Sequence, residues 1–328
     1  MNIPKVSIVI TTRNRPGLLK RALGSALHQM YQNFEIHVVD DASSDDQRCS
    51  IENLFAGCKK VHYWCHGNRR GLAAARNTGI AKSSGDYIAF LDDDDEWKPE
   101  CVTKRIALLQ DLPPDERKRL GVVYCGCEIR ILHENRITYS LPKMQGNIKD
   151  FICAHGPSTI PSSCLFPKEV LERIGGFDEH LLSSIDHDIW MNLATQGYYA
   201  CSVKEPLVIT YHVRRRNSMV TDMEPRIQGV EQFLKKWRVT YEEWFGREGA
   251  RRFIRHYRTR VLGDLAGKKL IEGELRESTH LMFHVIDRNG WSISSSSLLI
   301  WLVGRNIVRM LLPSKVIEIA KKNTRLWY

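Results

Sequence analysis

The sequence predicts an α/β protein, in which a mostly parallel β-sheet is flanked by helices and followed by a helical C-terminal region. Over residues 6–95, short β-branched runs alternate with segments of helical periodicity. Three of the four strands expected there end in polar clusters, which are TTRNR, DDASSDD and DDDDEW. Beyond Pro225 the pattern is helical, with few turn residues before position 290.

The first half of the chain alternates strands and helices. Strands are expected at 6–11, 34–41, 61–66 and 87–95, and helices at 16–29, 50–57 and 71–85, with a turn at 41–46. Strands joined through helices pair in parallel, and ligands of such sheets bind beyond the carboxyl ends of the strands. The three polar clusters therefore predict a binding site at that edge.

The second half mixes strand and helix patterns. Strands are expected at 121–132, 137–142 and 206–212, and helices at 166–181 and 183–197. The last of these strands runs into a basic turn with the sequence VRRRNS. A cluster of three arginines directly after a strand is well suited to phosphate oxygens.

Composition favours a folded protein of the cytoplasm. Of the 328 residues, 43% are hydrophobic and 26% are charged, which argues against both a disordered chain and a membrane-embedded one. The first apolar run, VSIVI, is too short for a signal peptide. The nine cysteines are odd in number and form no C-x-x-C pair, so we expect free thiols in a reducing compartment.

The positive charge of the chain is confined to its C-terminal third. The segment from Arg226 onward contains 20 of the 48 Lys and Arg residues but only 10 of the 38 Asp and Glu residues, which accounts for the whole net charge of +10. A nucleic-acid footprint would not segregate this way, and no recognition motif supports one. An anionic membrane surface or an acidic acceptor fits better. Residues 298–312 are too short to span a bilayer, and they predict either an interfacial helix or one packed on the protein's own helices.

Four consecutive carboxylates, from Asp92 to Asp95, follow the fourth expected strand. Like charges at neighbouring positions repel, so the cluster is either a solvated acidic turn or a site that a cation neutralises. Closely spaced carboxylate oxygens suit hard divalent cations such as Mg²⁺ or Mn²⁺. Because alternate residues of a strand share a face, Asp92 and Asp94 are expected to point together.

Five ordered blocks carry a family resemblance. They are VSIVITTRNRPGLLKRAL, IHVVDDASSDD, NRRGLAAARNTGIAKSSGDYIAFLDDDDEW, IPSSCLFPKEVLERIGGFDE and SSIDHDIWMNLATQG, within residues 5–219. Together they resemble glycosyltransferase family 2, whose members are inverting enzymes with the Rossmann-like, nucleotide-sugar-binding GT-A fold. The resemblance implies a GT-A domain over 1–224, with the nucleotide-sugar half at about 1–100 and the acceptor half at about 101–224. Residues 225–328 would form a basic helical region that faces the membrane or the acceptor.

The resemblance also implies which residues bind the donor. A strand-end carboxylate can accept the imide N–H of uracil, which favours a UDP-sugar donor. The family pattern places Asp93 near the ribose and Asp94, with Asp92, on a divalent metal. The other positions that correspond to donor-binding residues are Thr11, Arg13, Asp40, Asp41, Arg76 and Asn77.

The block SSIDHDIW resembles the family's E-D-x-D-x-W segment, in which the first Asp is the catalytic base. That residue is Asp186 here, and an inverting transfer needs such a carboxylate to take the proton of the attacking hydroxyl. The acidic residue that usually precedes the base is replaced by Ile185, so Asp188 remains a second candidate. The acceptor pocket would include Trp190 and the serines of IPSSC, which are Ser162 and Ser163.

The run YHVRRRNS resembles a family loop that closes over the diphosphate. Related sequences place a metal-binding histidine near position 214, which is Arg214 here. Either His212 reaches the metal instead, or Arg214, Arg215 and Arg216 hold the diphosphate directly.

The function that the resemblance implies is metal-dependent, inverting transfer of a hexosyl or N-acetylhexosaminyl group. The donor would be a UDP-sugar, and the acceptor a hydroxyl of a carbohydrate or lipid-linked molecule in cell-surface polysaccharide, lipopolysaccharide or glycolipid synthesis. A nucleotide-sugar-binding scaffold with impaired catalysis is an alternative, because of Ile185. A sugar nucleotidyltransferase would need a glycine-rich phosphate loop after the first strand, and TTRNRPG lacks one. We expect a cytoplasmic enzyme, peripheral on the inner face of the membrane if the basic tail binds lipid.

Overall fold

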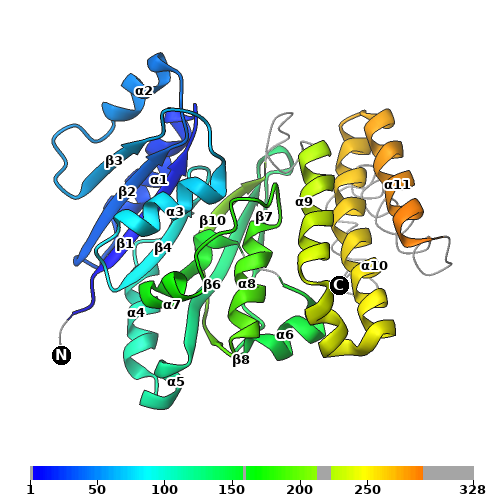
Figure 1. Cartoon of the computed structure of the whole chain (residues 1–328). Helices are drawn as coiled ribbons and strands as arrows, with labels where there is room; N and C mark the ends of the chain where they lie inside the picture. The colour runs from blue at the N-terminus through cyan, green and yellow to red at the C-terminus, as the bar shows by residue number, and fades with distance from the viewer. Residues whose placement is uncertain (1–2, 158–159, 213–222, 291–328) are drawn as a thin grey trace. The chain divides into compact units, whose positions relative to one another are not determined.

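The computed structural model describes residues 3–157, 160–212 and 223–290. The chain divides into two compact units (Figure 1). The first comprises Met1–His180 and Ile185–Val213, and the second comprises Leu181–Ser184 and Arg214–Tyr328. The first unit contains the sheet and the second is helical.

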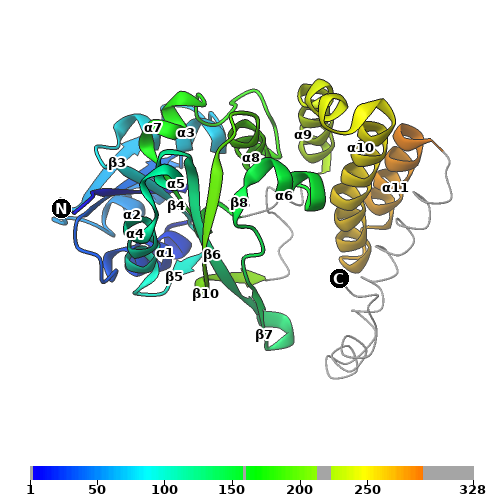
Figure 2. The same ribbon diagram turned by 90° about the horizontal axis from the view of Figure 1, so that it is seen from below.

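The first unit is built on one mixed sheet with the strand order β3-β2-β1-β4-β9-β6-β10-β5, with β7 paired to β6 and β8 to β10. Figure 2 shows the β6–β7 hairpin at one end of this sheet. The strands are β1 Val6–Thr12, β2 Phe34–Asp40, β3 Val61–Cys65, β4 Tyr87–Asp92, β5 Glu96–Trp97, β6 Leu120–Ile131, β7 Arg136–Ser140, β8 Gly146–Asn147, β9 Cys164–Pro167 and β10 Tyr199–His212. The helices are α1 Pro16–Leu27, α2 Asp45–Glu52, α3 Leu72–Lys82, α4 Cys101–Asp111, α5 Pro114–Lys118, α6 Ile148–His155, α7 Lys168–Arg173 and α8 Ile185–Thr195, with 3₁₀ turns at Leu132–Glu134 and Pro161–Ser163.

The predicted mostly parallel sheet is confirmed, and its register aligns the polar strand ends. β1 pairs in parallel with β2 and β4, so that Thr12 lies opposite Asp40 and Thr11 lies opposite Asp92. All seven residues of β1 are buried, which explains its continuous apolar run. β9 runs antiparallel to both β4 and β6, and the strands β5, β7 and β8 also pair antiparallel with their neighbours.

Two predicted helices begin at other positions in the structure. The helix expected at 50–57 is α2, which starts at Asp45 inside the expected turn, because Asp45 and Asp46 can interact with the positive end of the helix dipole. The helix expected from position 166 begins at Lys168, because Phe166 and Pro167 belong to the antiparallel strand β9. A short buried strand next to a helix gives no separate periodic signal, so the sequence pattern merged the two.

The helix α1 shows how the sheet is covered. Pro16 begins the helix, where its missing N–H costs nothing. Its buried residues are spaced at helical intervals and pack into the apolar core against the β1 and β2 side chains. They are Leu19, Ala22, Leu23 and Ala26.

The second unit contains α9 (Met223–Lys236), α10 (Arg238–Ile271) and α11 (Leu275–Asn289). The chain breaks helical geometry inside α10 at Gly246, whose φ is 68°. Buried Arg258 of α10 joins the three helices, because it donates to Glu231 of α9 at 2.6 Å and to Asn289 of α11 at 2.6 Å. A Cβ at Gly229 would lie 2.2 Å from the Ser183 nitrogen, so only glycine allows this close approach.

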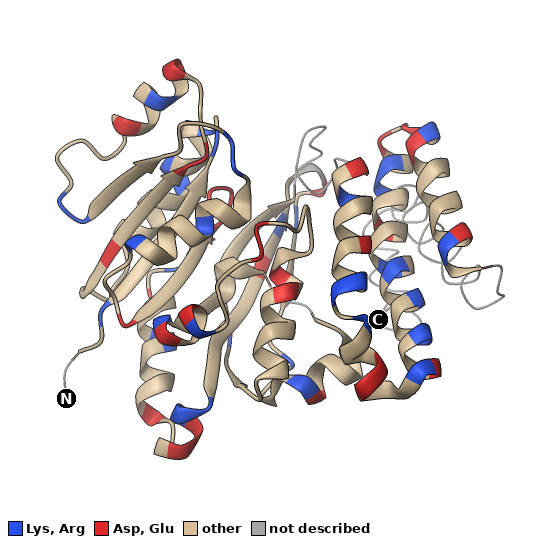
Figure 3. Ribbon diagram, in the orientation of Figure 1, with Lys and Arg blue, Asp and Glu red and all other residues tan. Residues whose placement is uncertain are grey.

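The helix α10 is rich in basic residues, which are blue in Figure 3. Nine Lys and Arg residues lie within α10 against four Asp and Glu residues. In the ranges that the structure describes, no helix combines the length and apolar character needed to cross a bilayer. The segment 298–312, for which the sequence left an interfacial helix open, lies outside the described residues.

Candidate active site

The first element of the site is the end of β2, where Asp40 is fully buried. Its carboxylate accepts hydrogen bonds from the Ser43 backbone N–H at 2.9 Å and hydroxyl at 2.6 Å, and from the Tyr63 hydroxyl at 2.8 Å. Within the same turn, Ala42 has a φ of 63°, in the left-handed region that side-chain-bearing residues rarely adopt. Strain of this kind persists only where the surroundings hold it, and it is common at functional sites.

The neighbouring carboxylate, Asp41, fixes the loop that leads into α3. It accepts hydrogen bonds from the backbone N–H groups of Arg70 at 2.7 Å and Gly71 at 2.8 Å. The His66 ring lies 2.9 Å from the same carboxylate. Burial opposes ionisation of Asp41, but these three hydrogen bonds outweigh it and hold the pKa of Asp41 below its ordinary value. The carboxylate is therefore ionised at neutral pH.

The acidic turn after β4 begins with a buried carboxylate, Asp93. The Thr12 hydroxyl donates to it at 2.8 Å, and Arg15 forms an ion pair with it at 3.2 Å. Burial raises the pKa of Asp93 to about 6, although the charge of Arg15 opposes the shift. The carboxylates of Asp94 and Asp92 add to the increase by repulsion. Burial and the neighbouring carboxylates therefore both disfavour ionisation of Asp93, whereas Arg15 and Thr12 favour it.

The far side of the acidic turn is anchored by Ser162. The Ser162 hydroxyl donates to Asp95 at 2.6 Å and accepts from the Asp92 backbone N–H at 3.1 Å. The Trp97 indole N–H donates to the Ser162 carbonyl at 2.7 Å. Burial raises the pKa of Asp95 well above its ordinary value. Ser162 is completely buried, as is Ser163 at 1% exposure, so both serines face the interior in this structure.

Arg21 of α1 joins the acidic turn to the end of β10. Its guanidinium donates to the Asp94 carbonyl at 2.7 Å and forms an ion pair with Glu96 at 2.9 Å. It also stacks on the Tyr211 ring at 3.9 Å, and the Tyr211 hydroxyl donates to Glu96 at 2.6 Å. The backbone of the acidic turn is therefore held from α1 and β10 together.

Arg76 of α3 connects the acidic strand end to α8. It is 1% exposed and donates to Asp92 at 2.8 Å and to Asp186 at 2.5 Å. Burial would lower the pKa of Arg76, but the charges of the two carboxylates outweigh it and raise that pKa. Asp92 and Asp186, which are 94 positions apart in the chain, are thus bound to the same guanidinium.

The next residue, Asn77, fixes the loop before α8. Its side-chain N–H donates to the Phe177 carbonyl at 2.8 Å and to Glu179 at 2.9 Å, and its oxygen accepts from the Phe177 N–H at 2.8 Å. A Cβ at Gly176, whose φ is 68°, would lie 2.6 Å from that oxygen, so glycine is required. In this structure the Asn77 side chain is therefore hydrogen-bonded to other groups of the protein.

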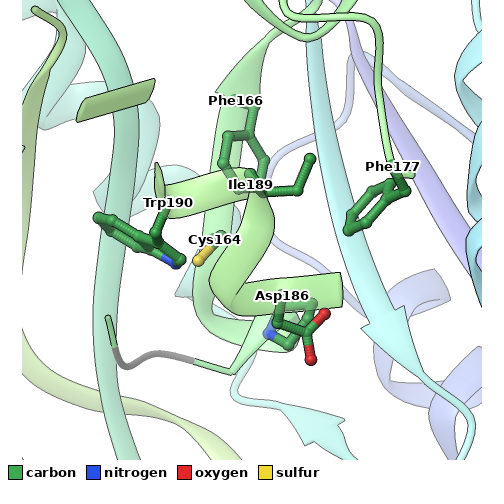
Figure 4. A pocket seen from close by; sticks show the side chains of 7 residues that line it. Cys164, Phe166, Phe177, Asp186, Ile189 and Trp190 are labelled. Carbon is green, nitrogen blue, oxygen red and sulfur yellow. The ribbon is translucent and has the colours of Figure 1, made fainter. Parts of the chain in front are cut away.

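Asp186 lines a small pocket, seen in Figure 4. The other residues that line it are uncharged. Asp186 lies in the first turn of α8, where the helix dipole favours an ionised carboxylate, and its side chain is 34% exposed. By contrast, Asp188 is completely buried and accepts from Asn192 at 3.1 Å in the same helix. The pocket residues are Pro161, Cys164, Phe166, Phe177, Asp186, Ile189 and Trp190.

The remaining predicted residues lie around the same edge. Thr11 is buried near the end of β1, and Arg13 is exposed in the loop that follows. His212 is exposed and is the last residue of β10. The segment with Arg214, Arg215 and Arg216 lies outside the described residues.

A divalent cation fits the chemistry of the acidic turn. Within the described ranges, no three His, Cys, Asp or Glu side chains come together in a way that could hold a metal ion. β4 ends at Asp92, so the strand alternation used in the sequence argument does not extend to Asp94. The side chains of Asp92 and Asp94 are each about one-third exposed, on either side of the buried Asp93. Their carboxylates offer hard oxygen ligands. Mg²⁺ is commonly held by one or two carboxylates plus water and phosphate oxygens, and this donor set matches that pattern.

Sequence reasoning missed several residues of this site. Arg15 lies within the TTRNR cluster, which the sequence argument singled out, but only the fold shows that it contacts Asp93. Arg21 lies in the first resemblance block but has no role in the sequence argument, and His66 lies outside all five blocks; they reach the site through the packing of α1 and the pairing of β3.

Comparisons with known proteins identify the family of the chain. The profile described as "Glycosyl transferase family 2" matches residues 7–175, which is more than half of the chain. The chain belongs to glycosyltransferase family 2. The match covers the acidic strand ends and ends before Asp186.

Curated relatives match part of the chain and part of their own length. An uncharacterized glycosyltransferase of Rickettsia felis is 30% identical over 205 residues, which cover 58% of this chain and 31% of that protein. The GalNAc(5)-diNAcBac-PP-undecaprenol beta-1,3-glucosyltransferase of Campylobacter jejuni is 38% identical over 95 residues, or 29% of this chain and 31% of that protein. The chain therefore spans about a third of the length of these two relatives.

Solved structures with the same fold cover nearly the whole chain. The mannosyltransferase PcManGT of Pyrobaculum calidifontis, in complex with GDP-Man and Mn²⁺, has a TM-score of 0.57 at 18% identity, covering 100% of this chain and 88% of that one. S. aureus TarS 1–349, in complex with UDP-GlcNAc, has a TM-score of 0.60 at 15% identity, covering 96% and 92%. The likeness confirms a GT-A type fold.

Proposed function

We propose that this glycosyltransferase moves a hexosyl or N-acetylhexosaminyl group from a UDP-sugar to an acceptor hydroxyl, with inversion at the anomeric carbon. The observation that carries the proposal is the position of Asp186, the only charged residue lining an otherwise uncharged pocket. Arg76 ties that carboxylate to the end of the acidic strand. A base on the acceptor side and an acidic edge on the donor side are the two parts that inverting transfer requires.

The donor nucleotide is assigned to the edge formed by β1, β2 and β4. Asp41 is ionised there, and Asp40 lies beside it, so a carboxylate oxygen can accept the imide N–H of uracil. Thr11 and Arg13 flank the same edge, and we assign Asp93 to the neighbourhood of the ribose as the family pattern implies. The TarS complex with UDP-GlcNAc supports a UDP-sugar on this fold, whereas PcManGT was solved with GDP-Man.

The transfer step uses Asp186 as general base. The acceptor oxygen forms a bond to the anomeric carbon while the bond from that carbon to the diphosphate breaks, and the hydroxyl proton passes to Asp186. UDP leaves from the opposite face of the sugar. Asp186 is favoured over Asp188 because Asp188 is completely buried and bonded within α8.

A divalent cation, Mn²⁺ or Mg²⁺, would be held by Asp94 and Asp92, with His212 a further candidate ligand at the end of β10. Bound there, the ion would neutralise charge on the departing diphosphate. The arginines Arg214, Arg215 and Arg216 remain candidates for the same diphosphate.

The acceptor is proposed to be a lipid-linked or cell-surface carbohydrate. The name of the Campylobacter relative includes a diphosphate-linked undecaprenol, which supports an acceptor of this class. The basic excess of the second unit would draw the enzyme to the anionic inner face of a membrane, where such acceptors are found. The alternative of a binding protein without catalysis loses support, since Ile185 leaves the Asp186 contact with Arg76 in place.

The test is a transfer assay with the full chain, a panel of UDP-sugars and a polyprenyl-diphosphate sugar acceptor, with the anomeric configuration of donor and product read by NMR. The proposal expects one UDP-sugar to give a product of inverted configuration. Retention of configuration, or transfer from GDP-sugars alone, would overturn it. Wild-type protein treated with EDTA serves as the control for metal dependence.

A further inference from the structure

Arg76 has a position that does not suit a donor ligand. Its side chain is 1% exposed, and its two terminal nitrogens each donate to a carboxylate, one to Asp186 and one to Asp92. Aromatic rings enclose the guanidinium, with Phe177 at 5.1 Å and Phe90 at 5.9 Å from its central carbon. A donor phosphate would have to displace both carboxylates to reach it.

The two carboxylates that Arg76 joins belong to different halves of the site. Asp92 ends β4 on the donor edge, and Asp186 begins α8 and lines the pocket on the acceptor side. A guanidinium is a rigid planar fork, so two carboxylates bound to its two ends are held at a fixed separation. Each of the two still has about one-third of its side chain exposed, at 31% for Asp92 and 34% for Asp186.

The neighbouring residue extends this arrangement. Asn77 holds the backbone of Phe177 through both its amide N–H and its amide oxygen. Phe177 in turn covers Arg76 and lines the pocket that contains Asp186. Successive residues of α3 thereby fix the base and one wall of the pocket around it.

We propose that Arg76 is a positioning residue, which holds the base Asp186 at a set distance from the donor edge by binding it and Asp92 at once. This inference rests on the proposed function, because it assigns Asp186 as the base. Arg76 does not touch the substrate. It acts through Asp186, and a displacement of the base by about 1 Å is enough to reduce transfer by about 100-fold.

The first experiment compares Arg76→Met and Arg76→Lys with the wild type in kcat, in KM for the acceptor and in UDP affinity by calorimetry. Arg76→Met is expected to lower kcat by about 100-fold and to leave the Kd for UDP within about threefold. Arg76→Lys keeps the charge but cannot bind both carboxylates in the same way, so it should recover about a tenth of the wild-type kcat. Loss of UDP affinity with unchanged kcat would overturn the proposal and make Arg76 a donor ligand.

A matched control separates positioning from simple stabilisation. Arg105 is also completely buried, but its guanidinium stacks on Trp97 at 4.7 Å, and it shares no ion pair with Asp92 or Asp186. Arg105→Lys is expected to lower the melting temperature while kcat stays within about threefold of the wild type. An equal loss of kcat in Arg105→Lys and Arg76→Lys would mean that any buried arginine is needed, which contradicts a positioning role.

A double variant tests whether Arg76 acts through the base. If it does, Arg76→Met should add less than about threefold to the loss already caused by Asp186→Asn. Multiplicative losses would refute the inference.

Crystal structures give a readout that does not depend on activity. The Asp186 carboxylate should move away from Asp92 in Arg76→Met, and an unmoved carboxylate would overturn the positioning role even if the protein transferred no sugar. If the wild type transferred sugar from none of the UDP-sugars, the proposed function would be refuted. The positioning role would still be tested by the position of the Asp186 carboxylate.

Discussion

Replacing Asp41 by Asn should destabilise the first unit by about 3 kcal/mol. The Asp41 carboxylate takes hydrogen bonds from two backbone N–H groups and from His66, at 2.7 to 2.9 Å. An asparagine keeps one oxygen and turns an N–H₂ group toward one of those donors. A buried donor left without a partner costs about 1–3 kcal/mol, and weakening two charge-assisted bonds adds about 1 kcal/mol or more.

The assay is thermal unfolding followed by circular dichroism at several pH values. A loss of about 3 kcal/mol corresponds to about 6–12 °C for a unit of this size. Because the folded protein lowers the pKa of Asp41, its contribution is complete above the ordinary value of 3.8 and is lost as the pH falls through the lower folded value. The difference between wild type and Asp41→Asn should therefore be constant from pH 7 to about 5 and shrink below about 4.

The control is Asp45→Asn, since the Asp45 side chain is 96% exposed and forms a surface ion pair with Arg48, at 3.7 Å, within α2. It should change stability by less than about 0.5 kcal/mol. Equal melting temperatures for Asp41→Asn and wild type, or a gap that persists unchanged at pH 3, would refute the reasoning about this carboxylate.

Three further predictions concern the other carboxylates. Asp94→Ala should abolish metal-dependent UDP binding in calorimetry while the melting temperature stays within about 2 °C, and retained metal-dependent binding would contradict its assignment. Asp186→Asn should keep UDP binding and lose transfer, and surviving transfer would move the base to Asp188 or another group. Burial raises the pKa of Asp93 to about 6, so its contribution to stability is present below pH 3.8 and is lost as the pH rises through about 6. In EDTA, the free energy of unfolding of Asp93→Asn should exceed that of the wild type by about 1–3 kcal/mol at pH 7.5, and the difference should vanish at pH 4. Urea titrations at the two pH values measure it. A variant less stable than the wild type at pH 7.5 would contradict the burial argument.

The parallel part of the fold could be predicted from the sequence because each strand there is a separate apolar run. The helices α1, α2 and α3 separate β1, β2, β3 and β4 from one another, and the ends of β1, β2 and β4 carry the polar clusters. β9 has only four residues and is followed at once by a helix, so its antiparallel insertion between β4 and β6 depends on pairing that no local pattern encodes.

For the site, the sequence indicated which residue types gather but not what they contact. Arg76 and Asn77 are one motif in sequence, yet the fold turns both toward the protein's own groups and away from the solvent edge. Ser162 lies in the block predicted to face the acceptor, but the short 3₁₀ turn Pro161–Ser163 directs its hydroxyl to Asp95. Such partners come from residues far apart in the chain, which tertiary structure alone brings together.

The central claim is that the acidic edge is a UDP-sugar donor site. Isothermal titration of the full chain with UDP and a panel of UDP-sugars, in Mn²⁺ and again in EDTA, tests it most directly. The account predicts that one UDP-sugar binds tightly with Mn²⁺ and loses most of that affinity in EDTA. Absence of UDP binding under both conditions would contradict it.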